Sequence, residues 1–149
     1  MNSEKPIKFI DKNKNSLLKD LQTLIHQPSI SAKNEGIKEC SVLVSKMLKK
    51  SGIKSEILRL GKNAAPLVYG EVKSKNNPNN TLLFYNHYDV QPVEPLELWD
   101  DPPFSGKIIG NKIFGRGASD DKGELITRIK AVESYLKTYG DVPCNVKFV

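Results

Sequence analysis

Apolar residues recur at helical spacing in two segments near the beginning of the chain. In the first segment they define one face of a helix that Pro28 ends, and they are Leu17, Leu18, Leu21, Leu24 and Ile25. The second segment also has the spacing of a helix, and Gly52 is suited to cap its C-terminal end. Its apolar residues are Ile37, Cys40, Val44, Met47 and Leu48. We therefore predict two amphipathic helices, preceded by a loose arm over residues 1–12.

The middle of the chain has the patterns of strands. Residues 55–60 and 67–72 are rich in alternating apolar and β-branched residues, which favours short strands. Residues 81–85 are apolar at nearly every position. This pattern predicts a strand buried on both faces, as in the centre of a helix-covered sheet.

The last part of the chain predicts a hairpin, a helix and a closing strand. The hairpin covers residues 107–114 and turns at Gly110 and Asn111, and the strand covers residues 145–149. Between them, the helix has an apolar face formed by Leu125, Ile129, Val132 and Leu136. This order of elements predicts an α/β fold with a mixed sheet flanked by helices.

Composition limits the number of domains and the class of function. A chain of 149 residues with 38% hydrophobic content can form one core, so we expect one domain or part of one. The formal net charge of +6 comes from scattered lysines without a run of five basic residues, which argues against nucleic-acid binding. No stretch approaches the roughly 20 apolar residues of a membrane span, and no apolar signal core is present. We expect a cytoplasmic protein that contacts no membrane.

The cysteines point away from sulfur chemistry. Cys40 and Cys144 are the only two in the chain, and they do not form a Cys-x-x-Cys pair. Neither a disulfide framework nor a thiolate zinc site is therefore indicated. We expect both to be small buried residues.

A histidine and an aspartate follow the apolar run over residues 81–85. His87 comes just after the predicted strand, where open α/β sheets place their ligand sites. If the chain stays extended, Asp89 points the same way and its carboxylate can accept the imidazole N–H that does not face a ligand. Such a pair is typical of a carboxylate–histidine–metal arrangement. The same local sequence also fits a histidine that is only hydrogen-bonded within a loop. A second site is needed to decide between a metal ligand and such a loop histidine.

Two adjacent carboxylates supply that second site. Asp120 and Asp121 stand at the predicted start of a helix, where one aspartate is an ordinary cap but two repel each other unless a cation or a shared proton compensates. A bound divalent metal is the economical explanation. A phosphate loop is the alternative, but the Gly-x-x-x-x-Gly-Lys-Ser/Thr pattern is missing and the acidic pair would repel an anion.

The residues around the acidic pair fit the same hypothesis. Glycines at positions 115, 117 and 123 permit a tight path with positive φ that brings the carboxylates close to a metal. We expect Arg116 and Lys122 to pair with the aspartates when no metal is bound.

Three blocks of sequence together resemble metallopeptidase family 20, the di-zinc exopeptidases, and especially its carnosinase-type dipeptidases. The blocks are Asn-His-Tyr-Asp-Val-Gln-Pro at 86–92, Trp-Asp-Asp-Pro-Pro-Phe at 99–104, and Ile-Phe-Gly-Arg-Gly-Ala-Ser-Asp-Asp-Lys-Gly at 113–123. Relatives include aminoacylases, acetylornithine deacetylase and succinyl-diaminopimelate desuccinylase. The resemblance implies that residues 1–149 are the amino-terminal part of a zinc-exopeptidase catalytic domain, a partial metallohydrolase domain.

The resemblance also implies roles for individual residues. His87 matches a ligand to one zinc ion, Asp120 the carboxylate that bridges both, and Asp89 the catalytic aspartate that holds the histidine. The peptide bond between Asp120 and Asp121 is expected to be cis. The implied cofactors are two divalent ions, zinc above all, with cobalt or manganese as alternatives. The implied reaction is hydrolysis of a peptide or amide bond in a dipeptide or N-acyl amino acid through a zinc-bridged hydroxide.

Several parts of the family's site would lie beyond Val149. They include the glutamate that acts as general base, the remaining metal ligands and the inserted lid domain that often mediates homodimer formation. We therefore expect the 149-residue chain alone to bind zinc weakly and to be inactive. The alternative to a metal-dependent hydrolase is that the chain is a catalytically incomplete fragment or a non-enzymatic binding module.

Overall fold

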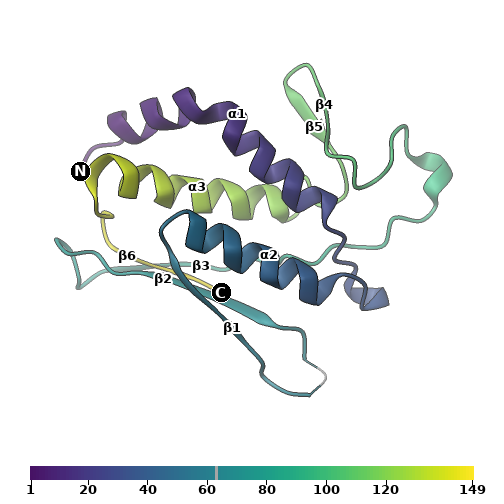
Figure 1. Ribbon diagram of the computed structural model, residues 1–149, viewed down its shortest axis with the longest axis horizontal. Coiled ribbons are helices and arrows are strands. Elements are labelled where there is room, and N and C mark those ends of the chain that lie inside the picture. Colours follow the sequence, from purple (N-terminus) through teal and green to yellow (C-terminus); the bar gives the residue numbers. More distant parts are fainter. Residues whose placement is uncertain (63) are drawn as a thin grey trace.

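The computed structural model describes residues 1–62 and 64–149, and in this part of the chain helices lie on one face of a mixed sheet (Figure 1). The α-helices are α1 (Glu4–His26), α2 (Ile37–Lys50) and α3 (Lys122–Tyr139). The strands of the main sheet, in spatial order, are β1 (Lys54–Leu58), β2 (Leu67–Val72), β6 (Asn145–Phe148) and β3 (Thr81–Phe84). The α/β fold with a mixed sheet that the sequence predicts is thus confirmed.

β2 runs opposite to the other three strands of the main sheet. β2 pairs antiparallel with both β1 and β6, whereas β3 and β6 are parallel. Because parallel neighbours need a crossover connection, the chain between them passes through α3. A separate hairpin, β4 (Lys107–Ile109) and β5 (Lys112–Phe114), precedes α3 and lies where the glycine pattern predicts it.

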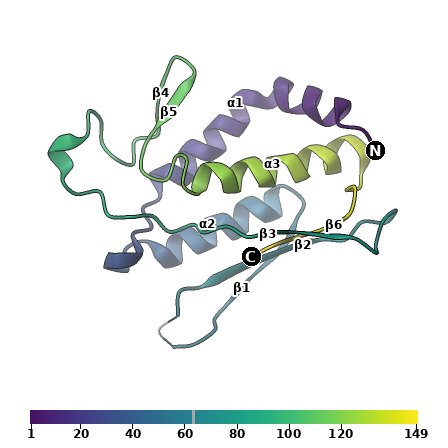
Figure 2. The ribbon, with the colours of Figure 1, turned by 180° about the vertical axis from the view of Figure 1, so that it is seen from behind.

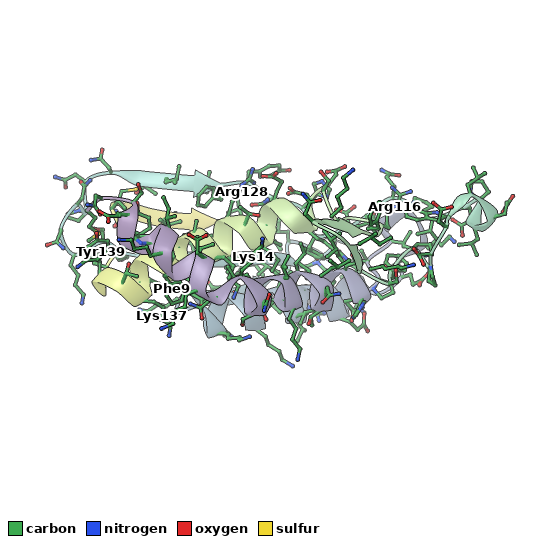
Figure 3. All side chains as sticks on the ribbon, turned by 90° about the horizontal axis from the view of Figure 1, so that it is seen from above. Phe9, Lys14, Arg116, Arg128, Lys137 and Tyr139 are labelled. Carbon is green, nitrogen blue, oxygen red and sulfur yellow. The ribbon has the colours of Figure 1, made fainter. Side chains whose placement is uncertain are left out.

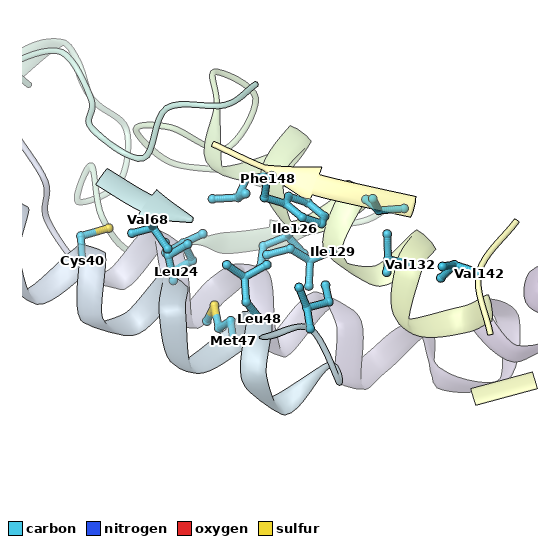
Figure 4. Packing of buried hydrophobic residues seen from close by; sticks show 14 residues of the cluster. Leu24, Cys40, Met47, Leu48, Val68, Ile126, Ile129, Val132, Val142 and Phe148 are labelled. Atoms are coloured by element: carbon cyan, nitrogen blue, oxygen red, sulfur yellow. The ribbon is translucent and has the colours of Figure 1, made fainter. Parts of the chain in front are cut away.

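The core lies between the helices and the sheet. Leu24 of α1, Leu48 of α2 and Ile129 of α3 are at most 1% exposed and meet Phe148 of β6 in one cluster (Figure 4). Burying an aliphatic or aromatic side chain of this size contributes about 1.5–3 kcal/mol each. The apolar faces predicted for the helices are the faces that form this core.

The edge position of β3 corrects one prediction. Residues 81–85 were expected to form a strand buried on both faces, yet Leu83 is 56% and Tyr85 79% exposed. The reason is that β3 pairs only with β6 and forms an edge of the sheet. Among the described residues no helix covers the face on which Leu83 lies. An all-apolar run identifies a strand, but it does not say whether neighbours cover both faces.

The beginning of the chain corrects a second prediction. Residues 1–12 were expected to form a loose arm, but α1 starts at Glu4 and Pro6 is buried. Proline is favoured in the first turn of a helix because its missing N–H has no partner there. The ring of Tyr139 fixes this turn further, since its hydroxyl donates to Asn2 Oδ1 at 2.8 Å and Lys5 Nζ lies 5.5 Å from the ring centroid.

α1 and α3 are also joined by an ionic network. Lys130 of α3 contacts Asp20 of α1 and, 2.8 Å away, Glu133, and Lys50 of α2 contacts Asp20 at 2.9 Å. Figure 3 shows α1 lying along the bundle, with Tyr139 at one end and Arg116 at the other. Burial would raise the pKa of Asp20, but its hydrogen bonds to Lys130 and Lys50 outweigh this effect and lower the pKa below its usual 3.8.

No helix in the described ranges has the length and apolar character to cross a membrane. Cys40 is buried as expected, whereas Cys144 is only partly buried.

We predict that Asp20→Asn lowers the free energy of unfolding by about 1.5–3 kcal/mol near neutral pH, because Lys130 loses a charged partner. A lowered pKa stabilises the fold above pH 3.8, and the stabilisation is lost as pH falls through the folded-state pKa. Urea titrations of both proteins at several pH values test this. Glu4→Gln, which removes an exposed partner of Lys8, is the control and should change stability by less than about 1 kcal/mol. Equal stabilities for wild type and Asp20→Asn at neutral pH would contradict the prediction.

Candidate metal site

His87 is mounted just beyond the carboxyl end of β3. The main-chain N–H of Asn86 continues the sheet by donating to Val149 O at 3.0 Å. After it, the chain leaves the sheet and is held from the side by Ser29, whose Oγ donates to Tyr88 O at 2.7 Å and whose carbonyl accepts from Val90 N at 2.8 Å. Burial raises the pKa of Tyr88 to about 12, and its hydroxyl donates to Pro66 O. The loop that carries His87 is therefore fixed at both ends.

Asp120 lies in a tight turn that leads into α3. The bond between Asp120 and Asp121 is cis, as the family resemblance implies. Two glycines make the turn possible. Gly117 has a φ of +84°, which favours glycine, and a Cβ on Gly123 would lie 2.1 Å from the carbonyl oxygen of Ala118. The sequence prediction that glycines permit this path is confirmed at Gly117 by its φ and at Gly123 by close packing.

The two predicted metal ligands meet where these loops come together. Figure 2 shows β3 running toward the end of the molecule at which α3 begins. There His87 Nε2 lies 2.9 Å from Asp120 Oδ1. The other ring nitrogen, Nδ1, lies 3.0 Å from the main-chain carbonyl of Asp89 and 3.3 Å from its carboxylate Oδ1. Because a carbonyl and a carboxylate only accept, both ring nitrogens donate in this geometry. When the ring loses one proton, the bond to Asp89 keeps the other proton on Nδ1, and the lone pair is then on Nε2, facing Asp120.

Nearby carboxylates control the charge of His87. Burial alone would lower its pKa, but the hydrogen bonds to Asp89 and Asp120, with the charge of Asp121, raise the pKa above the usual 6.5. The metal-free site therefore holds a proton on the ring at higher pH than a free histidine does. That proton occupies the position at which a cation would bind.

Asp121 has a role that the sequence analysis missed. Its Oδ2 accepts hydrogen bonds from Asn86 Nδ2 at 2.7 Å and from the main-chain N–H of His87 at 3.0 Å. Asp121 thus clamps the His87 loop to the start of α3, while Asp120 next to it faces the histidine. An asparagine directly before His87 was the available signal for this contact.

Arg116 and Lys122 correct the expectation that they pair with the aspartates. Arg116 Nη2 donates to Pro92 O at 3.1 Å, and its guanidinium lies 5.2 Å from the ring centroid of Trp99. Lys122 turns away from the carboxylates and donates to main-chain carbonyls of Leu24 and Gln27. The length of both side chains lets them reach main-chain carbonyls away from the aspartates. The acidic cluster is therefore left without either cation.

Open space adjoins His87 on more than one side. One cavity of about 310 Å³ is lined by Asp89, Gln91, Asp120 and the glycine-rich turn as well as by His87. A larger groove of about 860 Å³ is also bordered by His87 and Asp89, together with apolar residues such as Leu67, Tyr85 and Phe148. His87 thus borders both spaces.

The donor atoms suit a zinc-like divalent ion. An imidazole nitrogen and a carboxylate oxygen, each about 2.1 Å from one tetrahedral zinc, would stand about 3.4 Å apart. His87 Nε2 and Asp120 Oδ1 are 2.9 Å apart, which is close to this spacing. Within residues 1–62 and 64–149, no His, Cys, Asp or Glu joins them to form a group of three that could hold a metal. The described chain thus offers a pair of ligands of the right chemistry.

Part of this chain matches a known protein family. Peptidase family M20/M25/M40 matches residues 83–149, the segment that contains both His87 and Asp120. This chain belongs to that family. A succinyl-diaminopimelate desuccinylase from Blochmanniella pennsylvanica is 32% identical over 92% of this chain and 35% of the relative. The Cys-Gly metallodipeptidase dug1 of Schizosaccharomyces pombe is 34% identical over 98% of this chain and 33% of the relative.

Solved M20 structures share the fold as well. A metallo-carboxypeptidase from Sulfolobus solfataricus superposes with a TM-score of 0.81 at 39% identity, over 89% of this chain and 29% of that one. Human carnosine dipeptidase 1 gives a TM-score of 0.83 at 25% identity, over 97% and 33%. The M20 chain described here spans about a third of the length of the curated relatives it matches. Its structure therefore corresponds to part of the M20 catalytic domain.

We predict that Asp120→Asn lowers the pKa of His87 toward 6.5 in metal-free protein, because the ring loses a charged hydrogen-bond partner. Titration of the His87 ring by NMR measures the change directly. The raised pKa stabilises the metal-free fold below pH 6.5, and this contribution is lost as pH rises through the folded-state pKa. Glu4→Gln, which changes an exposed carboxylate in the first turn of α1, is the control and should leave the His87 titration as in wild type. An unchanged His87 pKa in Asp120→Asn would contradict the geometry.

Proposed function

We propose that this chain carries the first part of the active site of a metal-dependent hydrolase that cleaves a peptide or amide bond. The observation that carries the proposal is the 2.9 Å approach of His87 Nε2 to Asp120 Oδ1 within the segment that matches the M20 family. The substrate we propose is a dipeptide or an N-acyl amino acid. Support comes from relatives named as a Cys-Gly metallodipeptidase and a carnosine dipeptidase. The cytoplasmic location and the homodimer of a longer protein stay predictions.

Each of these residues has a separate role in the proposed site. His87 and Asp120 would hold divalent metal, and we propose two ions, zinc in preference to cobalt or manganese. When bound, such ions polarise a substrate carbonyl and lower the pKa of water. Asp89 keeps the proton of His87 on Nδ1, so that Nε2 is available as a ligand. Asp121 fixes the separation of the two loops through Asn86 and the His87 amide.

The open spaces beside His87 support a proposal for where the substrate binds. The amide bond to be hydrolysed must reach His87 and Asp120, and the side chain of the substrate needs space nearby. The 860 Å³ groove beside His87 has the apolar border that small peptide side chains prefer. The 310 Å³ cavity on the side of Gln91 and the glycine-rich turn is smaller, and its lining includes the polar residues Asp89 and Asp120. We propose that the scissile bond lies between these two spaces.

The ligand pair limits what the 149-residue chain does by itself. Catalytic zinc sites usually keep three protein ligands, and proton transfer needs a base within hydrogen-bond reach of the attacked bond. The described ranges contain no group of three His, Cys, Asp or Glu residues that could hold a metal, which leaves His87 and Asp120 as a pair. The second candidate function is therefore a binding module that holds metal without turnover.

We predict weak zinc binding by the purified chain, and loss of that binding in His87→Ala and Asp120→Ala by about tenfold or more. Isothermal titration with zinc, at a pH above the pKa of His87, measures the affinity. His26→Ala removes the other histidine of the chain, whose Nε2 lies 2.7 Å from Ser105 O, and should bind zinc as wild type does. If all the variants bind zinc equally, the ion sits elsewhere and the proposed site is wrong.

We also predict that the purified 149-residue chain does not hydrolyse dipeptides in the presence of zinc, cobalt or manganese. The reason is that the described residues supply a pair of metal ligands, whereas catalytic zinc sites usually keep three. Release of amino acid from Cys-Gly and from an N-acyl amino acid can be followed by chromatography. A metal-dependent rate that Asp120→Ala abolishes would show instead that two ligands suffice, and would remove the binding-module alternative.

A further inference from the structure

Lys122 is the first residue of α3 and directly follows the two aspartates of the site. Its side chain is 0% exposed, although it ends in an ammonium group. A buried charge is usually paired with a carboxylate. Among the described residues none of the ion pairs includes Lys122, so its location needs another explanation.

The ammonium group of Lys122 caps the end of α1. Its Nζ donates to Leu24 O at 3.1 Å and to Gln27 O at 2.6 Å. The Leu24 carbonyl would ordinarily accept from the N–H four residues later, but that residue is Pro28, which has no N–H. The last carbonyls of a helix also carry partial negative charge. Lys122 therefore satisfies acceptors that the sequence of α1 leaves without partners.

The same side chain closes the turn that contains Asp120. Lys122 N donates to Gly117 O at 3.1 Å, and a Cβ on Gly117 would lie 3.2 Å from Lys122 Cδ. The turn over residues 117–122 is thus packed around the lysine stem. Because the ammonium is bonded to α1, the whole turn is attached to the end of that helix.

The His87 loop is attached to the same place. Ser29, two residues after Gln27, bonds to Tyr88 O and Val90 N through its hydroxyl and its carbonyl. Residues 27–29 therefore form a common mount for both loops of the site. Lys122 holds one loop to this mount, and Ser29 holds the other.

We propose that Lys122 is a positioning residue for the metal site: by bonding the end of α1 it fixes the distance between Asp120 and His87. The inference rests on the proposed function for the role of these two residues as ligands. Lys122 itself touches neither metal nor substrate. Its effect is transmitted through the turn to Asp120 and Asp121.

The test compares two buried lysines of the same helix. Lys122→Met keeps the length of the stem and removes the donors. Lys130→Met is the matched control, because Lys130 is also buried on α3 but bonds Asp20 and Glu133 away from the site. The first readout is amide hydrogen exchange of His87, whose N–H is bonded to Asp121 Oδ2, relative to the amide of the core residue Ile129. The second readout is the zinc dissociation constant.

In Lys122→Met we expect the His87-to-Ile129 exchange ratio to rise about tenfold and zinc affinity to fall by about tenfold or more. In Lys130→Met we expect lower global stability with both readouts unchanged. Lys122→Arg, which retains charge and donors, should restore most of the loss. If Lys122→Met does not fold, Lys122→Gln is measured in its place, and a smaller change in the same direction is expected.

Two results would overturn the proposal. One is an unchanged exchange ratio in Lys122→Met, or in Lys122→Gln where that variant replaces it. The other is an equal change in Lys130→Met, which would show only a general loss of stability. Wild-type protein that binds no zinc would refute the proposed function instead. The exchange ratio would still decide whether Lys122 positions the turn, because that measurement needs no metal.

Discussion

The parallel pairing of β3 with β6 is the constraint on which the rest of the site depends. Two parallel neighbours can be connected only if the chain crosses back to the end of the sheet at which the first strand began, and α3 makes this crossing. The crossover helix therefore begins at the end where β3 finishes. His87 follows the strand and Asp120 precedes the helix, so the crossover brings together residues that are 33 positions apart. The site is a consequence of this connection.

Electrostatics then gives the meeting point its chemical character. Three carboxylates, those of Asp89, Asp120 and Asp121, surround the His87 imidazole, and they raise its pKa. Each nearby basic residue has a main-chain partner elsewhere. Lys122 bonds the end of α1, and Arg128 Nη1 donates to Tyr85 O at 3.1 Å. The local excess of negative charge is the physical reason to expect a cation there.

The sequence predicted the location of this site well and its supports poorly. Helical spacing, the turn at Gly110 and the strand at 145–149 were enough to place His87 after a strand and Asp120 before a helix, because these signals are local. The edge position of β3 was missed because it depends on how many neighbours the strand acquires. The length of α1 was missed because its first turn carries no regular apolar stripe.

The supporting contacts escaped prediction for a different reason. The hydrogen bonds between Asp121 and Asn86 and between Lys122 and Leu24 join segments 35 and 98 positions apart. The identity of an aspartate or a lysine does not indicate which distant residue it will contact. Only Pro28 gave a hint, since it deprives Leu24 of its usual donor. Candidate ligand residues are thus recognisable from motifs, whereas the residues that hold them in place emerge from the three-dimensional packing.

The central claim is that His87 and Asp120 bind the same ion. Crystals of the chain grown with zinc, with anomalous diffraction measured on both sides of the zinc absorption edge, test this claim most directly. The account predicts an anomalous peak about 2.0–2.2 Å from both His87 Nε2 and an Asp120 carboxylate oxygen. A structure in which zinc binds elsewhere, while His87 and Asp120 keep their direct contact, would contradict it.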